Sequence, residues 1–186
     1  LFLEIYAEKI FPFSLQSNII GILFRSFIII SFCEELVKWL FTYVICWKDK
    51  NFNYVYDAIV YCVFISLGFA SIENLIAILS NSGGFTLALQ RGLITVPAHA
   101  FFGIISGYYL GLAKKYEARR WNKRKRKYII LSLLIPIIVH GMFDSLLFLS
   151  STASLLFATA LIVYLYLSSA LKVVKTSSEA KKITRR

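Results

Sequence analysis

Five long apolar stretches alternate with short polar segments along the chain, and each stretch is long enough to cross a lipid bilayer as a helix. A membrane-spanning helix needs about 20 mostly apolar residues. The predicted spans cover residues 18–47, 57–79, 85–113, 128–149 and 152–171. A glycine-containing segment at 81–84 separates the second span from the third. The pattern predicts an all-α protein, a polytopic transmembrane helix bundle with about five spans.

The two ends of the chain differ from this pattern. Residues 1–15 mix acidic, basic and aromatic side chains, and we expect them to form an interfacial N-terminal segment. Residues 16–171 make up the predicted membrane domain, and residues 172–186 make up a basic tail. Because the chain begins with Leu1 and not with Met, we also expect further sequence upstream.

Composition supports a membrane protein over a soluble one. Hydrophobic residues make up 58% of the chain and charged residues only 17%, and the mean hydropathy is +0.68. Soluble domains are about 45–50% apolar. The net charge of +11 would otherwise suggest nucleic-acid binding, but the basic runs lie beside membrane-length segments. We therefore expect the lipid bilayer as a partner and no nucleic acid.

Lysine and arginine are concentrated in three regions that five spans would place on one side of the membrane. Nine lie within residues 114–127, six within 172–186, and two are Lys48 and Lys50, which makes 17 of the 21 basic residues. Cytoplasmic loops of membrane proteins carry such an excess. We therefore expect a multi-pass protein of the plasma membrane, with loop 114–127 and the C-terminal tail in the cytoplasm.

Several ionisable side chains lie inside the predicted spans, where a charge costs roughly 2.5–3.5 kcal/mol on insertion scales. Such residues normally face the bundle interior, pair with one another and serve a function. At about 1.5 Å of rise per residue, their carboxyl and imidazole groups fall within one or two helical turns of a common plane. This set comprises Glu34, Glu35, Lys38, Glu73, His99, His140 and Asp144. Because four spans contribute to it, we expect a catalytic core of four helices.

Helical spacing groups these residues further. Lys38 lies within reach of Glu34 at i+4 and of Glu35 at i+3, and His140 and Asp144 share a face at i and i+4. These contacts could also be purely structural ties between helices. We expect Arg25 and Arg91 to face lipid, with no role in chemistry, and Asp57 to cap a helix start. Gly103, Gly107 and Gly111 follow His99 at four-residue intervals, which allows a neighbouring helix to approach closely.

Membrane-embedded carboxylates and histidines suit several classes of protein. They occur in proton-coupled transporters as well as in intramembrane enzymes, although the chain shows no inverted repeat. A non-catalytic membrane scaffold is a third alternative.

Four short motifs, in order, resemble the PrsW family of intramembrane proteases, which is related to the CAAX-protease and bacteriocin-processing group. Residues 32–39 resemble its Glu-Glu-x-x-Lys motif, and residues 56–61 with 68–74 resemble its second motif. Residues 97–100 and 140–144 resemble the third and fourth motifs. The resemblance implies that residues 16–171 are an intramembrane protease domain in a bacterial plasma membrane. It also implies a substrate, a single-span membrane protein of the anti-sigma factor type.

The related CAAX-protease group has a histidine where this chain has Glu73, so His99, one helix later, is expected to supply that imidazole. By the same resemblance, Glu34 is the general base that activates water. The remaining roles follow from the chemistry that peptide hydrolysis needs. Glu35, held by Lys38, adjusts the electrostatics of the site, and His99 helps to orient or activate the water. His140, oriented by Asp144, stabilises the oxyanion. Lys38, Glu73 and Asn74 support these residues.

A metal site is the alternative for the same residues. Two histidines and a carboxylate can hold a catalytic zinc ion and leave its fourth position to water. His99 and His140, with Glu73 or Glu35, would be the ligands. The chain has no His-Glu-x-x-His helix, so the sequence favours the metal-free, glutamic type and no cofactor, with Zn²⁺ as the alternative.

Overall fold

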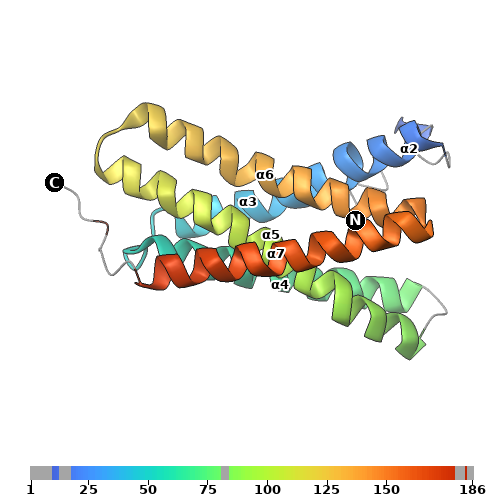
Figure 1. The fold of residues 1–186 in the computed structure, drawn as a ribbon. Helices are drawn as coiled ribbons and strands as arrows, with labels where there is room; N and C mark the ends of the chain where they lie inside the picture. The colour runs from blue at the N-terminus through green and yellow to red at the C-terminus, as the bar shows by residue number, and fades with distance from the viewer. Residues whose placement is uncertain (1–9, 13–17, 81–83, 179–182, 184–186) are drawn as a thin grey trace.

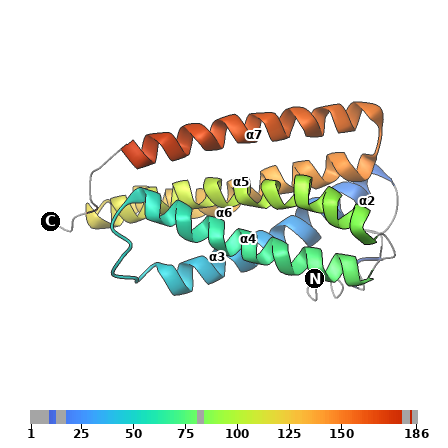
Figure 2. The ribbon, with the colours of Figure 1, turned by 90° about the horizontal axis from the view of Figure 1, so that it is seen from below.

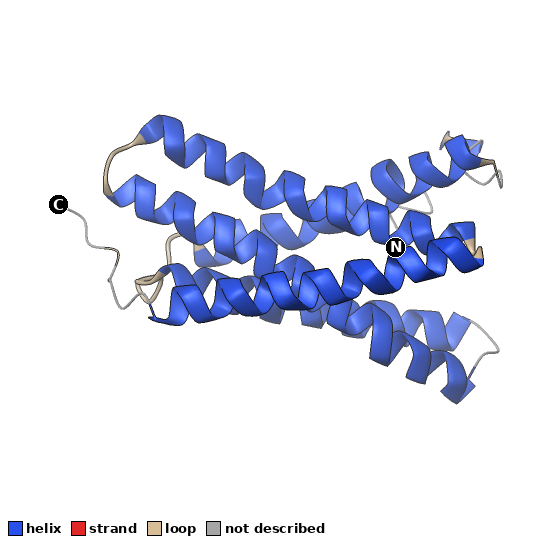
Figure 3. Cartoon of the chain, in the orientation of Figure 1, coloured by secondary structure: helices blue, strands red, loops and turns tan. Residues whose placement is uncertain are grey.

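The computed structural model describes residues 10–12, 18–80, 84–178 and 183. Over these residues the chain is almost entirely helical, without a strand, as Figure 3 shows. The elements are α2 (Ile19–Phe24), η2 (Arg25–Ser31), α3 (Phe32–Cys46), α4 (Val55–Ser80), α5 (Gly84–Ala118), α6 (Asn122–Leu149) and α7 (Thr152–Ser178). The predicted all-α bundle is confirmed. The predicted segment 1–15 lies mostly outside the described residues.

The helices from α4 to α7 are each long and apolar enough to cross a membrane. The first predicted span is made of three segments in succession, α2, η2 and α3. Its middle segment, η2, is a π-helix of seven residues that ends immediately before α3. π-Helical turns are rare in proteins, and those that occur often lie at functional sites. This one ends two residues before the Glu34–Glu35 pair.

The helices pack in three layers, which Figure 2 shows from the side. The central layer holds α5 and α6; α7 covers one of its faces, and α3 and α4 lie on the other. Trp39 of α3 donates a hydrogen bond from Nε1 to Ser132 Oγ of α6 at 2.8 Å, and Ser106 Oγ of α5 donates to the Ser132 carbonyl at 2.8 Å. The residue Ser132 therefore joins three helices.

The glycine track on α5 permits a close contact with α4, as its spacing predicts. A Cβ atom added at Gly107 would lie 2.5 Å from the Cα of Ile59 and 2.6 Å from the carbonyl oxygen of Ala58. Gly103 and Gly111 are similarly close to Cys62 and Val55 of α4. These neighbours are largely backbone atoms and cannot move aside. The α4–α5 contact therefore requires glycine, which has no side chain, at these positions.

Replacing Gly107 by Ala should therefore destabilise the protein, by about 1–3 kcal/mol as for other overpacked sites. The matched control is Gly92→Ala in the same helix, where no atom lies within 4 Å of the added Cβ; it should leave stability unchanged or raise it by about 0.4–1 kcal/mol. Unfolding in mixed micelles, followed by circular dichroism, measures both. Equal stability of the two variants would contradict the tight contact.

The described parts of the three basic regions lie at one end of the bundle, as predicted. Figure 1 shows the α3–α4 connection, the α5–α6 turn and the end of α7 together on the left. The helices extend beyond the predicted spans there, because α5 continues to Ala118, α6 starts at Asn122, and α7 continues to Ser178. Lysine and arginine are good helix formers, so the predicted loop 114–127 is helical except for its turn at 119–121.

The start of α4 is held as predicted. Asp57 Oδ2 accepts hydrogen bonds from the backbone N–H groups of Asn53 and Tyr54, at 2.7 and 2.8 Å. The carboxylate thus satisfies backbone donors that the helix itself leaves unpaired.

Candidate functional site

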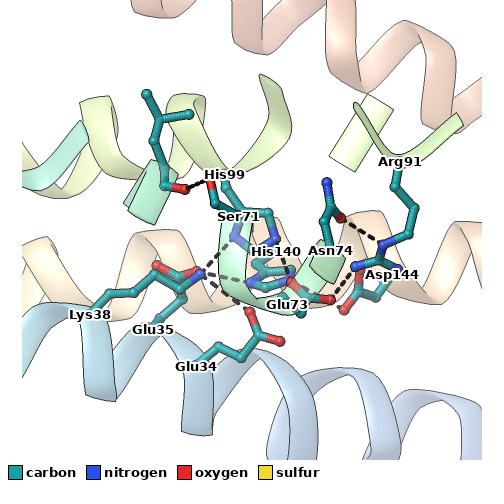
Figure 4. Close-up of polar contacts among 11 residues, drawn as sticks. Glu34, Glu35, Lys38, Ser71, Glu73, Asn74, Arg91, His99, His140 and Asp144 are labelled. Atoms are coloured by element: carbon teal, nitrogen blue, oxygen red, sulfur yellow. Dashed lines mark hydrogen bonds and ion pairs between the residues drawn. The ribbon is translucent and has the colours of Figure 1, made fainter. Parts of the chain in front are cut away.

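The predicted ionisable residues converge inside the bundle from four helices (Figure 4). α3 supplies Glu34, Glu35 and Lys38, α4 supplies Glu73 and Asn74, α5 supplies His99, and α6 supplies His140 and Asp144. Five of them, Glu34, Glu35, Lys38, His99 and His140, are at most 4% exposed. The spacing along the sequence thus brings these side chains together inside the bundle.

Lys38 is the cation at the centre of this cluster. Its Nζ lies 2.6 Å from Glu35 Oε1 and 3.3 Å from Glu34 Oε2. The same nitrogen lies 2.9 Å from His99 Nδ1 and 4.7 Å from the centre of the Phe69 ring. The predicted pairing of Lys38 with both glutamates is therefore present, and it extends to the histidine of α5.

The contacts of His99 assign its tautomer. The ammonium group of Lys38 can only donate hydrogen bonds, so Nδ1 of His99 is the acceptor in the 2.9 Å contact. The ring proton then lies on Nε2, which is 3.2 Å from Glu73 Oε2. Glu73 therefore orients the imidazole of His99 through its protonated nitrogen.

His140 has a carboxylate against each ring nitrogen. Its Nδ1 lies 2.9 Å from Glu35 Oε1, and its Nε2 lies 3.3 Å from Asp144 Oδ2. Its ring stacks on Phe102 with centroids 4.6 Å apart and meets the His99 ring edge-on at 5.3 Å. Since a carboxylate only accepts hydrogen bonds, both nitrogens can donate here when the ring is an imidazolium.

Arg91 belongs to the site, contrary to the expectation that it faces lipid. It forms an ion pair with Glu73 and donates a hydrogen bond from Nε to Asn74 Oδ1 at 2.7 Å. Figure 4 shows it reaching from α5 toward α4. This pair can be predicted from the sequence. Residues 73 and 91 are equally distant from the connection between α4 and α5, and an antiparallel hairpin therefore places them side by side. A buried carboxylate within a span needs such a partner.

Glu34, His99 and His140 form the group best placed to hold a metal ion. One ligand atom of each lies within 4.8 Å of the others. The carboxylate of this group is Glu34, whereas the sequence suggests Glu73 or Glu35. Those two instead lie at hydrogen-bond distance from His99 and His140, where they orient the imidazoles.

The fold and the site thus define a polytopic helical membrane protein with a buried centre of carboxylates and histidines. Comparison with known proteins gives the family: the model described as "PrsW family intramembrane metalloprotease" matches residues 1–171. The chain belongs to this PrsW family, and the resemblance seen in its motifs is confirmed. None of the solved structures matches it.

Proteins named "Protease PrsW" are similar to this chain. The one from Halalkalibacterium halodurans is 42% identical over 129 residues, which cover 69% of this chain and 57% of that protein. The one from Clostridioides difficile is 33% identical over 164 residues, 87% of this chain and 68% of that protein. The one from Bacillus subtilis is 37% identical over 127 residues, 68% of this chain and 56% of that protein. The chain thus spans a little over half the length of two of these relatives.

Proposed function

We propose that the protein is an intramembrane endopeptidase whose reaction centre is formed by Glu34, His99 and His140. The observation that carries the proposal is the meeting of these three buried side chains, from three helices, within 4.8 Å of one another. Peptide hydrolysis needs a group that activates water and groups that stabilise the oxyanion, and carboxylates and imidazoles can do both. The relatives named as proteases support this function.

We favour the metal-dependent type over the metal-free type that the sequence favours. One carboxylate and two imidazoles are a common ligand set of catalytic zinc, and the family carries the description of a metalloprotease. The charge of the site also fits a divalent cation. Four carboxylates (Glu34, Glu35, Glu73 and Asp144) meet two permanent cations (Lys38 and Arg91), so neutral imidazoles leave two uncompensated negative charges.

Zinc bound by Glu34, His99 and His140 would supply Lewis-acid polarisation of the peptide carbonyl and a water activated near neutral pH. The side chains around these three hold them in place. Glu73 faces Nε2 of His99 and holds the ring proton there, so Nδ1 carries the lone pair. Lys38 occupies that lone pair at 2.9 Å, and it would have to release it to a metal ion. Glu35 faces Nδ1 of His140 and orients that ring. Ligating histidines usually donate their second N–H to a carboxylate in this way.

Arg91 positions His99 through Glu73, and its loss should weaken the centre. Arg91→Ala should lower zinc affinity and turnover by about 10–100-fold, the usual effect of removing a partner behind a metal ligand. Arg91→Lys keeps the positive charge but lacks the planar guanidinium group, so its zinc affinity and turnover should lie between those of Arg91→Ala and the wild type. Arg126→Ala, at an exposed position of α6, is the control. Wild-type zinc affinity in Arg91→Ala would exclude the positioning role.

The substrate we propose is a single-span membrane protein of the anti-sigma factor type, as the family resemblance implies. A centre enclosed by membrane helices is reached by a peptide that itself lies in the membrane. The more exposed members of the site, Arg91, Glu73 and Asp144, lie on its side away from the basic end of the bundle. We therefore place the cleaved bond toward the extracytoplasmic face.

This orientation follows from the positive-inside rule, which puts the basic end of the bundle in the cytoplasm of a bacterial cell. A cysteine introduced at Asn122, in the α5–α6 region, should resist a membrane-impermeant maleimide added to intact cells. It should react once the cells are opened. A cysteine introduced at Ser151, between α6 and α7 at the opposite end, should react from outside. Labelling of position 122 from outside would reverse the proposed topology.

The proposed function is tested with purified protein in detergent and tagged single-span anti-sigma factors as the probe. We expect a defined cleavage product, about one zinc ion per chain by elemental analysis, and loss of cleavage with a chelator that zinc restores. Cleavage without bound metal would favour the glutamic type. Absence of cleavage for every candidate, together with proton-coupled uptake in vesicles, would favour a transporter, and absence of both would favour a scaffold.

A further inference from the structure

The turn between α5 and α6 carries a cationic surface that the proposed reaction does not use. We call the turn surface the group formed by Arg119, Arg120, Trp121, Lys123 and Arg124. A shallow, open depression of about 340 Å³ lies there, lined by Trp121, Asn122, Lys123 and Arg124. Trp121 is 47% exposed, and the lysine and arginine beside it are exposed as well.

Two guanidinium groups of this surface are held in place by aromatic rings. Arg124 lies 4.7 Å from the Trp121 ring centre and 5.5 Å from that of Tyr116. Arg119 lies 5.8 Å from the Trp121 ring centre. An arginine stacked on a ring keeps its N–H edge available, and this edge matches the two oxygens of a phosphate. The cations are therefore ordered before any ligand binds.

The charge of the turn surface is not balanced by the acidic residues that the structure describes. Glu117 is the one acidic residue in 114–127. It forms ion pairs with Lys125 at 2.5 Å and with Lys114 at 3.5 Å. Among the described residues, Arg119 and Arg124 have no acidic partner. An anion from outside the chain is thus the complement that this surface lacks.

The surroundings indicate a lipid in preference to a free anion. One face of α6 carries Lys123 and then Ile130 and Leu134, because seven and eleven residues are close to whole numbers of helical turns. Ile130 is 60% exposed and Leu134 is 45% exposed. The cationic turn surface thus continues into an exposed apolar strip along the membrane-spanning part of the same helix. This matches a phosphate headgroup followed by an acyl chain.

We propose that the turn surface is a binding site for the phosphate headgroup of one anionic phospholipid, with its acyl chain along Ile130 and Leu134. The guanidinium groups of Arg119 and Arg124 bind the phosphate oxygens, and Trp121 holds both groups in position. Tryptophan at the boundary of a span is itself favoured at the headgroup level. Such a site differs from diffuse attraction to an anionic bilayer, because it depends on the geometry at Trp121 as well as on charge.

Native mass spectrometry of the purified protein, titrated with phosphatidylglycerol or phosphatidylcholine, tests the site. We expect the double variant Arg119→Gln/Arg124→Gln to raise the dissociation constant for phosphatidylglycerol by about tenfold or more, since each cation near a lipid surface contributes several-fold. Trp121→Ala removes no charge and should weaken binding several-fold. The control Lys48→Gln/Lys50→Gln removes two exposed charges from the same end of the bundle and should have less than a twofold effect.

Three results would overturn the proposal. Equal weakening by the two double variants, with no effect of Trp121→Ala, would show diffuse attraction only. Equal affinity for phosphatidylcholine would exclude recognition of the anionic headgroup. Inorganic phosphate that binds as tightly as phosphatidylglycerol would identify a free-anion site. None of these measurements depends on protease activity, so their outcome is separate from that of the proposed function.

Discussion

Replacing Glu34 by Gln should abolish peptide hydrolysis while the protein stays folded. The side chain is 3% exposed and belongs to the group with His99 and His140. Glutamine keeps the shape but carries no negative charge and cannot accept a proton from water. We expect turnover to fall by at least about 100-fold, the lower range for loss of a general base, together with most of the bound zinc.

The control for this variant is Glu117→Gln, the same substitution at the far end of α5, which should retain activity and zinc. Zinc analysis of the Glu34→Gln protein separates the two roles of the residue. An inactive protein that keeps its zinc would identify Glu34 as the general base, as the family resemblance implies, and not as a ligand. Substantial turnover would remove Glu34 from the reaction centre and transfer the role to Glu35.

Replacing Lys38 by Ala should lower the stability of the protein by about 3–5 kcal/mol, the usual cost of removing one partner from a buried ion pair. Lys38 Nζ lies 2.6 Å from Glu35 and 3.3 Å from Glu34, and its loss leaves those buried carboxylates without their common cation. The yield of monodisperse protein and the unfolding midpoint in mixed micelles measure the effect.

Two further variants separate charge from packing. Lys38→Met keeps most of the side-chain volume and should be nearly as unstable as Lys38→Ala, because the missing charge is the cause. Lys175→Ala, at an exposed position of α7, should match the wild type. Full stability of Lys38→Met would show that the aliphatic stem, and not the ammonium group, holds this part of the bundle.

The sequence predicts the fold well because a bilayer leaves few alternatives. Backbone polar groups in hydrocarbon must be paired within the chain, so apolar stretches of this length form helices. The charged residues inside those stretches must meet each other for the same reason, which is why Glu35, Lys38 and His140 are found in contact. The cost of an unpaired charge makes these contacts predictable without knowing how the helices are arranged.

The details that the sequence does not predict depend on how the helices are rotated and joined. The sequence alone predicts that Arg91 faces lipid, because an arginine near the end of a span often extends to the interface. Its actual partner, Glu73, becomes visible once α4 and α5 are paired as a hairpin. The choice of Glu34 over Glu35 at the His99–His140 pair depends on a fraction of a helical turn of α3, which periodicity alone does not resolve. The choice of Glu34 over Glu73 depends on how α3 and α4 are placed against α5 and α6.

The π-helix η2 has a consequence for how the chain tolerates the loss of a residue before α3. A π-helix holds an extra residue per turn relative to an α-helix, so deletion of one residue from Arg25–Ser31 could be absorbed by conversion to α-helix. Phe27 of η2 packs against Gly141 beside His140, which fixes the segment to α6. Such a deletion would leave α3 in its present phase, whereas the same deletion within an α-helical stretch would turn α3 by one residue, about 100°. The extra residue held in η2 can therefore be lost without changing which glutamate faces the histidines.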